Sequence, residues 1–404
     1  MTSWLSGQKS FRELLAKPAL TLGIDASNLR GGGGVTHLRE LLGNANPRAH
    51  GFSHVVVWGS KSTLSVLNSS DWLIARNPQL LEGSYAKRLL WQAFCLPRLA
   101  SNEKCDIVFA PGGTHFHGFR PVVTMSRNML PFELEELRRY GLSLISLRLL
   151  FLRYMQLFSF KTADGVIFLN QHASLRVQQV TGALRGYTKI IPHGVGARFF
   201  HDPKAQRPIS SYSINHPYRL LYVSIIDQYK HQWCLVEALG VLRKKTGWPL
   251  VLDLVGPAYP PALRRLEAAL ALWDPHEEWV VCHGAISYSQ LHELYQRVDL
   301  GLFASSCENM PNILLETMAA GLPIAASNRP PMSTILGDAG LYFNPLNPTS
   351  IASTLECLIG DQGLRARLST KSYSTAHSYS WPICASQTFS FLADVCTQWS
   401  ERVH

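Results

Sequence analysis

Two glutamates separated by seven residues give the strongest chemical signal in this sequence. Glu308 lies in a short polar loop after an apolar run, and a helix is expected to start near Pro311, where a missing N–H costs nothing, and to run to Gly321. Glu316 lies about a turn inside that helix. Free N–H groups at a helix N-terminus suit a phosphate, and a carboxylate can accept hydrogen bonds from two adjacent hydroxyls, as on a ribose. This segment therefore predicts a site for a sugar, a diphosphate and a ribose in a row.

Glycines and a basic residue in the first half add further candidates. Gly31–Gly34 follows an expected strand and precedes a helix expected to start near Val35, so the backbone can approach a diphosphate or an acceptor closely; a flexible turn is the alternative. The pattern is not GxGxxG and has no suitably placed acidic residue, which argues against a dinucleotide site. Arg127 and Asn128 follow the run 122–125 and either contact the acceptor or sugar, or cap the next helix.

Three further residues invite a catalytic interpretation that their surroundings weaken. His115 and His117 precede the run 122–125, but an isolated histidine is more often a surface or a hydrogen-bonded core residue than a catalyst. Cys307 adjoins Glu308 without any paired base, so packing is favoured over a nucleophilic role.

The elements that must position these residues follow one pattern along the chain. Short apolar runs of strand length occur at 20–24, 54–58, 107–110, 122–125, 165–169 and 189–191, and again at 219–224, 249–255, 279–283, 300–304, 323–326 and 340–343. Helical patterns lie between them, among others at 232–245, 262–273, 289–298 and 312–320. Alternation of this kind predicts an α/β protein with parallel sheets covered by helices on both faces.

The alternation occurs twice, with a segment rich in Pro, Ser and Asn at about 199–218 between the two halves. We therefore expect two doubly wound, Rossmann-like domains that face each other across a cleft, with ligands at the carboxyl ends of the strands. The expected division is an acceptor-binding domain over 1–198, a donor-binding domain over 199–382, and a final helix over 383–404 that packs back on the first domain.

The motifs around the two glutamates resemble those of the retaining glycosyltransferases of family 4, which have the GT-B fold. The resemblance is carried by LGLFASSCENMPNILLETMAAGLPIAASN (300–328), LLYVSIIDQYKHQWCLVEAL (220–239), HGAISYSQLHELYQRVDLGLFAS (283–305) and GDAGLYFNPLNPTSIASTL (337–355). It is looser at IIPHGV (190–195), with His193 where Asn is usual, and at GIDASNLRGGGGVTHLRELL (23–42). It covers residues 219–355 well and residues 20–200 less closely.

The resemblance implies roles for particular residues. Glu308 should touch the donor sugar near the reacting centre, Glu316 should bind the ribose of a nucleotide, and Lys230 should neutralise the leaving diphosphate. An Arg that the family usually has about six residues before that lysine is missing, because Ser224, Ile225 and Ile226 occupy the region. Phosphate stabilisation then falls on Lys230, on backbone N–H groups, or on a basic residue from elsewhere.

The predicted site therefore has a catalytic and a donor-binding set. The catalytic set is Glu308, Lys230, Asn128 and Arg127, and the donor-binding set is Glu316, Gly33, Gly34, Ser224, Asn309, Met310, Pro311, Asn312 and Ile313. A preorganised cation and a helix N-terminus stabilise the charge that builds on the leaving diphosphate. The sequence lacks an acidic DxD motif, so neither a metal nor another cofactor is expected beyond the nucleotide-sugar co-substrate.

The charge of the chain is concentrated in its first half. The formal net charge is +10, and residues 1–200 hold 23 basic and 11 acidic side chains, which is +12 and leaves −2 for the rest. Residues 137–161 interleave arginines with large apolar side chains. Such a stretch either lies on an anionic membrane or forms a core helix whose arginines reach the solvent. A membrane contact would suit a lipid-linked acceptor.

The compartment and the rival functions follow from what the sequence lacks. Its eight cysteines include no CxxC pair, and the N-terminal segment 1–17 lacks the apolar run of a signal peptide. A cytoplasmic protein is therefore expected, and the basic first half adds the expectation that it is peripheral on the inner face of the membrane. We expect a hexosyl transfer to a glycan or lipid-linked acceptor in cell-surface polysaccharide synthesis. The alternatives are a sugar-nucleotide epimerase and a non-enzymatic binder of an anionic polymer; nucleic acid is not an expected partner.

Overall fold

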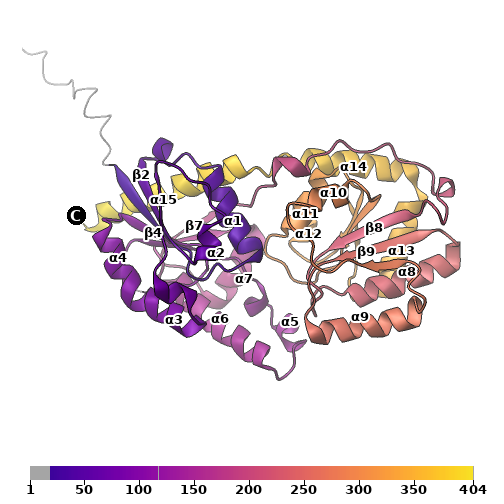
Figure 1. The fold of residues 1–404 in the computed structure, drawn as a ribbon, viewed down its shortest axis with the longest axis horizontal. Coiled ribbons are helices and arrows are strands. Elements are labelled where there is room, and N and C mark those ends of the chain that lie inside the picture. Colours follow the sequence, from indigo (N-terminus) through magenta and orange to yellow (C-terminus); the bar gives the residue numbers. More distant parts are fainter. Residues whose placement is uncertain (1–18, 117, 404) are drawn as a thin grey trace, which may run out of the picture.

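The computed structural model describes residues 19–116 and 118–403, which form two α/β domains lying side by side (Figure 1). The first domain has a seven-stranded sheet of order β3-β2-β1-β4-β5-β6-β7, and the second has a six-stranded sheet of order β10-β9-β8-β11-β12-β13. All pairings between neighbouring strands of the described chain are parallel. In both sheets the strand order reverses beside the first strand of the domain, and at such a point a doubly wound sheet leaves a crevice for a ligand.

The elements of the first domain alternate as the sequence predicts. Its strands are β1 (Leu20–Asp25), β2 (Phe52–Trp58), β3 (Leu73–Arg76), β4 (Ile107–Ala110), β5 (Val122–Met125), β6 (Gly165–Phe168) and β7 (Tyr187–Ile190). Its helices are α1 (Gly32–Gly43), α2 (Lys61–Leu64), α3 (Tyr85–Leu90), α4 (Leu96–Asn102), α5 (Leu134–Arg138), α6 (Leu144–Thr162) and α7 (Gln171–Thr181). A π-helical turn over Trp91–Cys95 joins α3 to α4.

The second domain repeats the same alternation. Its strands are β8 (Tyr218–Val223), β9 (Leu250–Val255), β10 (Val280–Cys282), β11 (Leu300–Phe303), β12 (Ile324–Ser327) and β13 (Leu341–Phe343). The helices that follow are α8 (Gln232–Thr246), α9 (Pro260–Trp273), α10 (Leu291–Tyr295), α11 (Asn312–Ala319), α12 (Met332–Leu336), α13 (Pro348–Gly360), α14 (Gln362–Ala376) and α15 (Trp381–Val403).

Strand β2 shows why the sheet has helices on both faces. Val55 and Val57 belong to a core cluster that includes side chains of α1 and α15, whereas Val56 and Trp58 belong to a cluster with side chains of α4 and the π-helical turn. Successive residues of a strand point to opposite faces, so an uninterrupted apolar run must be covered on both sides.

The chain passes between the domains twice. Residues 191–217 connect β7 to β8, and α15 starts at Trp381 beside the second domain and runs back over the first (Figure 1). Phe389 of α15 packs on Phe52 of β2 with ring centroids 5.9 Å apart. The backbone of Gly194 approaches Trp381 so closely that a Cβ there would lie 2.1 Å from the tryptophan backbone nitrogen, which leaves room for no other residue.

The predicted α/β fold is confirmed, and all twelve predicted strands overlap observed ones. The sequence analysis missed β3, a four-residue strand at the sheet edge whose residues are half-buried or exposed. An edge strand with few buried side chains lacks the apolar run that identifies a central strand. The last helix starts at Trp381, two residues before the predicted position.

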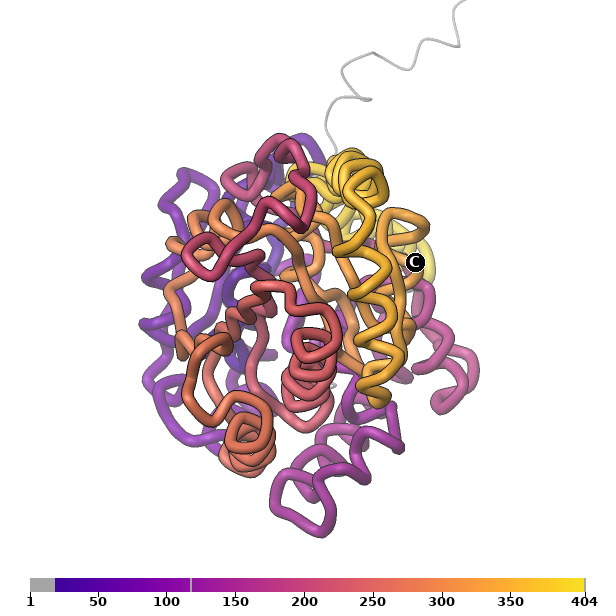
Figure 2. Tube along the Cα trace, turned by 90° about the vertical axis from the view of Figure 1, so that its right-hand side faces the viewer, coloured from indigo at the N-terminus to yellow at the C-terminus, as the bar shows by residue number. Residues whose placement is uncertain are grey.

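The segment of α5 and α6 projects at the bottom of the molecule in both views (Figures 1 and 2). Helix α6 buries mainly residues near its C-terminal end, Met155, Gln156, Ser159 and Phe160, and also Ser146, whereas large apolar side chains along most of its length are exposed. The exposed set is Leu144, Leu147, Leu150, Phe151, Tyr154 and Phe158. Thus only one end of this predicted amphipathic stretch is a core helix. Within the described chain, no helix has the length and apolar character needed to cross a bilayer.

Candidate active site

A cavity of about 590 Å³ lies between the domains. The N-terminal residues of α1 form one wall, and the loops after β8, β9 and β11 with the start of α11 form the other. Nine of the predicted site residues line it: Gly33, Ser224, Lys230, Glu308, Met310, Pro311, Asn312, Ile313 and the predicted ribose ligand Glu316. The structure thus brings most of the predicted donor site together at the carboxyl ends of the strands.

Helix α11 directs its N-terminus into this cavity. It begins at Asn312, with Pro311 as the N-cap residue and without a side-chain cap. The backbone carbonyl of Pro311 accepts from the N–H groups of Leu314 and Leu315. The N–H groups of Asn312 and Ile313 therefore stay available. Such groups and the positive end of the helix dipole suit a phosphate. The helical pattern predicted over 312–320 is observed as Asn312–Ala319, with Pro311 as the residue just before its first turn.

Lys230 and Glu308 form an ion pair at the cavity wall, with only 9% and 15% of their side chains exposed. The lysine Nζ donates to Glu308 Oε1 and also lies over the rings of Tyr229 and Phe303. The two charges of a largely buried ion pair attract each other more strongly than those of a solvent-exposed pair. The lysine is therefore held in place, and a diphosphate entering the cavity would compete with Glu308 for it.

Glu316 is buried and has both carboxyl oxygens engaged by tyrosines. Tyr288 Oη donates to Oε1 at 2.9 Å and Tyr295 Oη to Oε2 at 3.5 Å. Burial raises the pKa of Glu316 to about 8, against the effects of the Tyr288 hydrogen bond and of the nearby Arg198. Near neutral pH the carboxyl group can therefore offer an O–H donor as well as an acceptor, which suits a pair of vicinal hydroxyls.

The helix predicted to start near Val35 begins three residues earlier, so Gly31 is the N-cap residue of α1 and Gly32–Gly34 form its first turn. This glycine-rich loop, which is thus the start of α1, meets Arg127 on the side away from the cavity. Gly32 has a φ of +57°, a left-handed conformation that favours glycine. A Cβ on Gly34 would lie 2.8 Å from Arg127 Nη1, and one on Gly33 would lie 3.9 Å from Nη2. Gly33 lines the cavity between the domains, whereas Gly34 does not. The guanidinium of Arg127 thus lies directly behind the loop, and burial lowers its pKa to about 10.

Arg127, Asn128 and Gly34 line a second cavity of about 390 Å³ in the first domain. Gly31 lines both cavities, so the two adjoin at the glycine-rich loop. Asn128 Oδ1 accepts from the N–H of Leu130 at 3.0 Å, which is the local capping contact that the sequence left as an alternative. The structure therefore separates Arg127 and Asn128 from the cavity that holds Glu308 and Lys230.

Asn309 links the two domains and does not line the cavity between them. Its Nδ2 donates to the carbonyl of Ser126 at 2.9 Å, and its own carbonyl accepts from Asn170 Nδ2 at 2.5 Å. Tyr140 Oη donates to Asp227 Oδ1 at 2.9 Å as a further contact between the domains. The loop that carries Glu308 is therefore anchored to the first domain.

His193 also joins the domains. Its Nδ1 lies 2.8 Å from Asn312 Oδ1 at the start of α11, and its ring lies 4.7 Å from that of His37 and 5.6 Å from that of Trp381. Burial, with the charge of Arg127, lowers the pKa of His193 to about 3 and the pKa of His37 well below its usual value. Both imidazoles are therefore neutral at physiological pH.

The remaining candidates lie away from the cavity between the domains. His115 is buried, with Nε2 2.8 Å from the carbonyl of Ser159, and His117 lies outside the described residues. Cys307 packs in a core cluster with Met129 and Phe132, and burial raises the pKa of its thiol well above the usual value, in keeping with a packing role.

The sequence analysis did not find Tyr288, Arg198 or Trp381. Tyr288 and Arg198 reach Glu316 from a loop and from the connection between the domains, and Arg198 lies 4.3 Å from the Tyr288 ring. Tyr288 lies in the quoted motif 283–305 without a predicted role and Arg198 lies in none of the quoted motifs, so their position at Glu316 depends on tertiary packing.

The second domain resembles known proteins in sequence. Residues 217–361 match the family of glycosyl transferases group 1. The O-antigen chain mannosyltransferase B of Escherichia coli is 26% identical over 175 residues, which are 42% of this chain and 44% of that protein. The chain therefore spans less than half of this relative. The resemblance of the second domain to group 1 glycosyltransferases is confirmed.

Solved structures extend the comparison to both domains. HepE of Anabaena in complex with UDP and glucose has a TM-score of 0.67 at 16% identity and covers 93% of this chain and 100% of its own. WaaG, a glycosyltransferase involved in lipopolysaccharide biosynthesis, has a TM-score of 0.69 at 15% identity and covers 92% of this chain and 99% of its own. The chain has the GT-B fold.

Proposed function

We propose that this protein transfers a hexosyl group, with retention, from a nucleotide-diphosphate sugar to a glycan or lipid-linked acceptor. The observation that carries the proposal is the convergence of Glu316, the Lys230–Glu308 pair and the N-terminus of α11 on one cavity between the domains. The family match and the UDP complex of HepE support a nucleoside diphosphate as part of the donor. The relatives named for O-antigen and lipopolysaccharide synthesis support a role in making cell-surface polysaccharide.

The chemistry follows from the charges around the cavity. The bond between the anomeric carbon and the β-phosphate oxygen breaks, and the acceptor oxygen forms a bond on the same face. The acceptor proton passes to the leaving phosphate, so no carboxylate nucleophile is needed. Lys230 and the N–H groups of α11 stabilise the charge on the diphosphate, and Glu308 positions the sugar. We include no metal or other cofactor, since these groups supply the positive charge.

The leaving diphosphate needs a second positive charge, because the arginine that the family usually has before Lys230 is missing. Arg127 is our candidate, because its guanidinium lies behind the glycine-rich loop that lines the donor cavity. From there Arg127 would hold the glycine-rich loop in place and so position the diphosphate, while its side chain lies on the side of the second cavity. A second cavity that adjoins the first at Gly31 gives an acceptor a place to bind, which favours transfer over epimerisation of the sugar nucleotide.

The exposed apolar side chains of α6 support a peripheral contact with an anionic membrane. Arg148 is exposed on the same helix, and the first half of the chain carries a charge of +12. Apolar side chains that enter the interface and cations that meet anionic lipids act together in such contacts. We propose that this surface brings the enzyme to a lipid-linked acceptor at the inner face of the membrane.

The ribose role of Glu316 gives the most direct test. Thermal-shift measurements with GDP-, UDP-, ADP- and dTDP-sugars should find a donor that raises the melting temperature, because a ligand at 100 times its dissociation constant adds about 2.7 kcal/mol of stability. Glu316→Ala should lose most of that shift, whereas Glu293→Ala should keep it, since Glu293 is an exposed residue of α10 paired with Arg297. An equal shift in both variants would contradict the ribose role.

Epimerisation is distinguished by the products. The donor that is found should be incubated without any acceptor and followed by NMR. A sugar nucleotide inverted at one carbon would favour the epimerase, whereas slow release of the nucleoside diphosphate with hydrolysed sugar would favour the transferase.

A further inference from the structure

Among the residues that the structure describes, four arginines and no acidic residue line the second cavity. Arg30, Arg88, Arg127 and Arg148 come from the loop before α1, from α3, from the loop after β5 and from α6. The four positions are far apart in the sequence, so no local pattern required them to meet. Four positive charges around about 390 Å³ repel one another, which costs stability unless an anion binds between them.

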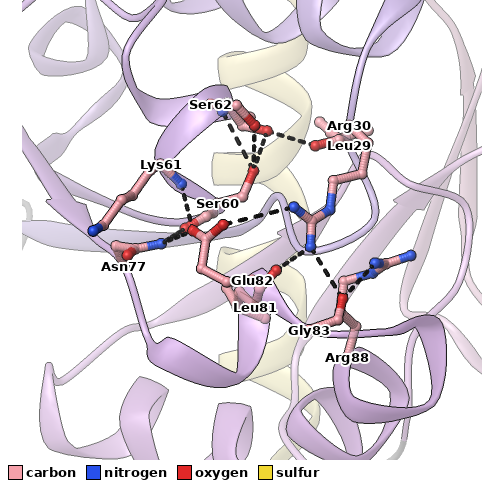
Figure 3. Close-up of polar contacts among 12 residues, drawn as sticks. Leu29, Arg30, Ser60, Lys61, Ser62, Asn77, Leu81, Glu82, Gly83 and Arg88 are labelled. Carbon is pink, nitrogen blue, oxygen red and sulfur yellow. Dashed lines mark hydrogen bonds and ion pairs between the residues drawn. The ribbon is translucent and has the colours of Figure 1, made fainter.

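Two of these arginines are fixed in place by backbone carbonyls (Figure 3). Arg88 Nη1 donates to the carbonyl of Gly83 at 3.1 Å, and Arg30 Nη2 donates to the carbonyls of Leu81 and Gly83. Burial and then the charges of Arg30 and Arg148 lower the pKa of Arg88. The fixed guanidinium groups are thus preorganised, and little conformational entropy is lost when they bind a phosphate.

The arginines are largely free of acidic partners within the described chain. Arg30 lies 3.9 Å from Glu82, but Glu82 is itself engaged by the N–H of Lys61 at 2.7 Å and by Asn77 Nδ2 at 2.8 Å. Arg88, Arg127 and Arg148 form no ion pair among the residues that the structure describes. Three of the four positive charges at this cavity therefore have no acidic partner in the described chain.

Polar atoms of the cavity-lining residues also lack partners. Asn28 Oδ1, Arg88 Nε, Arg127 Nε and Gln156 Oε1 are buried without a hydrogen bond in the described chain, and all four residues line the cavity. Buried polar groups are normally satisfied, and unsatisfied ones concentrate where a ligand or water binds. Asn28 Oδ1 and Gln156 Oε1 lie outside the arginine cluster, so these two acceptors indicate a ligand independently of it. They suit hydroxyl groups of the ligand, whereas the two Nε–H groups suit its phosphate oxygens.

We infer that this cavity binds a phosphate group of the acceptor, next to the donor diphosphate across Gly31. The inference rests on the proposed function and specifies its acceptor as a phosphate ester or a diphosphate. Guanidinium groups match phosphate oxygens in a bidentate geometry.

The position of the cavity favours a lipid as the carrier of that phosphate. Arg88 and Arg148 come from α3 and α6, and the same two helices, with the π-helical turn after α3, expose Leu90, Phe94, Leu147 and Phe151. A phosphate in the cavity would thus leave attached acyl or prenyl chains beside an apolar surface. A soluble sugar phosphate has no apolar chain that could contact that surface.

Binding of inorganic phosphate and of dihexanoylphosphatidic acid, measured by calorimetry at constant ionic strength, tests the inference. Arg148→Gln should weaken the binding of both by about fivefold; the exposed Arg148 has no hydrogen bond in the described chain, so the variant should fold. Arg88→Gln should weaken it further. Arg98→Gln removes an exposed arginine of the same domain outside the cavity and should change nothing. Equal weakening by Arg98→Gln, or no weakening by Arg148→Gln, would overturn the inference.

Two further measurements separate this site from the donor site. The weakening by Arg148→Gln should persist in a Lys230→Gln background, in which the donor cavity has lost its lysine; its disappearance there would place the measured phosphate in the donor cavity and overturn the inference. If no donor raises the melting temperature but the arginines still control phosphate binding, the proposed function fails and the anion site stands. Tighter binding of the lipid than of phosphate, by about tenfold or more, would identify a lipid carrier, and equal binding a soluble phosphate ester; both support the site.

Discussion

At the scale of single residues, the candidate active site keeps several groups in an unusual protonation state. Burial holds a proton on Glu316, with a pKa of about 8, and keeps His193 neutral, with a pKa of about 3. Glu316 lines the donor cavity, and His193 contacts Asn312, the N-terminal residue of α11. Perturbed groups of this kind gather at functional sites.

His193 leads to a prediction about stability and pH. In the unfolded chain a histidine takes up a proton near pH 6.5, whereas the folded chain keeps His193 neutral until about pH 3. The unfolded state then binds more protons between these values, so the free energy of unfolding should fall as pH falls through this window, by up to about 1.4 kcal/mol per pH unit for one histidine.

Urea unfolding at pH 7, 6 and 5 measures this effect. The free energy of unfolding should fall less steeply with decreasing pH in His193→Asn than in the parent protein, because the substitution removes one of the titrating groups. The lowered pKa of His37 preserves part of the slope. His276→Asn, at an exposed position, should retain the full slope. Identical slopes for the parent protein and His193→Asn would contradict the prediction.

At the scale of elements, the start of α1 separates the donor cavity from the cavity behind it. Gly33 faces the first and Gly34 the second, and Arg127 lies against Gly34. Because successive residues at a helix start point in different directions, adjacent glycines can serve two sites.

Gly34→Ala should displace Arg127, since the new Cβ would lie 2.8 Å from Nη1. The guanidinium end is flexible, so we expect stability to change little and kcat/KM for transfer to fall about tenfold, as small displacements of a positioning residue do. Gly43→Ala is the matched control, because Gly43 ends the same helix and its nearest heavy atom lies 3.8 Å from the added Cβ. Equal kcat/KM in the parent protein and Gly34→Ala would show that Arg127 is not needed.

At the scale of the whole molecule, the two domains differ in the surfaces that they present. The first domain carries the positive charge and the projecting α5–α6 segment (Figure 2), whereas the second supplies most of the donor cavity. Contacts through Asn309, His193 and Tyr140 hold the domains together. The arrangement places the exposed apolar side chains of α6 on the first-domain side of the cleft.

Membrane contact is testable with vesicles. Leu144, Leu147 and Phe151 are 85%, 64% and 47% exposed, so changing all three to Ser should leave the fold intact. Co-sedimentation with vesicles of phosphatidylcholine and phosphatidylglycerol should weaken by about 100-fold or more, since each side chain that enters the interface contributes on the order of 1.5 kcal/mol. Leu272→Ser, at a 71% exposed position of the second domain, should bind as the parent protein does. Undiminished binding of the triple variant would locate the contact elsewhere.

The sequence by itself determined the two α/β sheets and the donor half of the site. Apolar runs of strand length identify buried parallel strands, and Glu308, Pro311 and Glu316 lie close together along the chain, so one loop and one helix fix their relation. The edge strand β3 gave no such signal, because its side chains are not buried on both faces.

Only the tertiary structure decided which distant residues meet. Tyr288 and Arg198 around Glu316, the contact of Arg127 with Gly34, and the four arginines of the second cavity each join segments remote in sequence. Their positions depend on how helices pack on the sheets and how the domains face each other. Side-chain periodicity reports which face of an element is buried, and it carries no information about the partner across the interface.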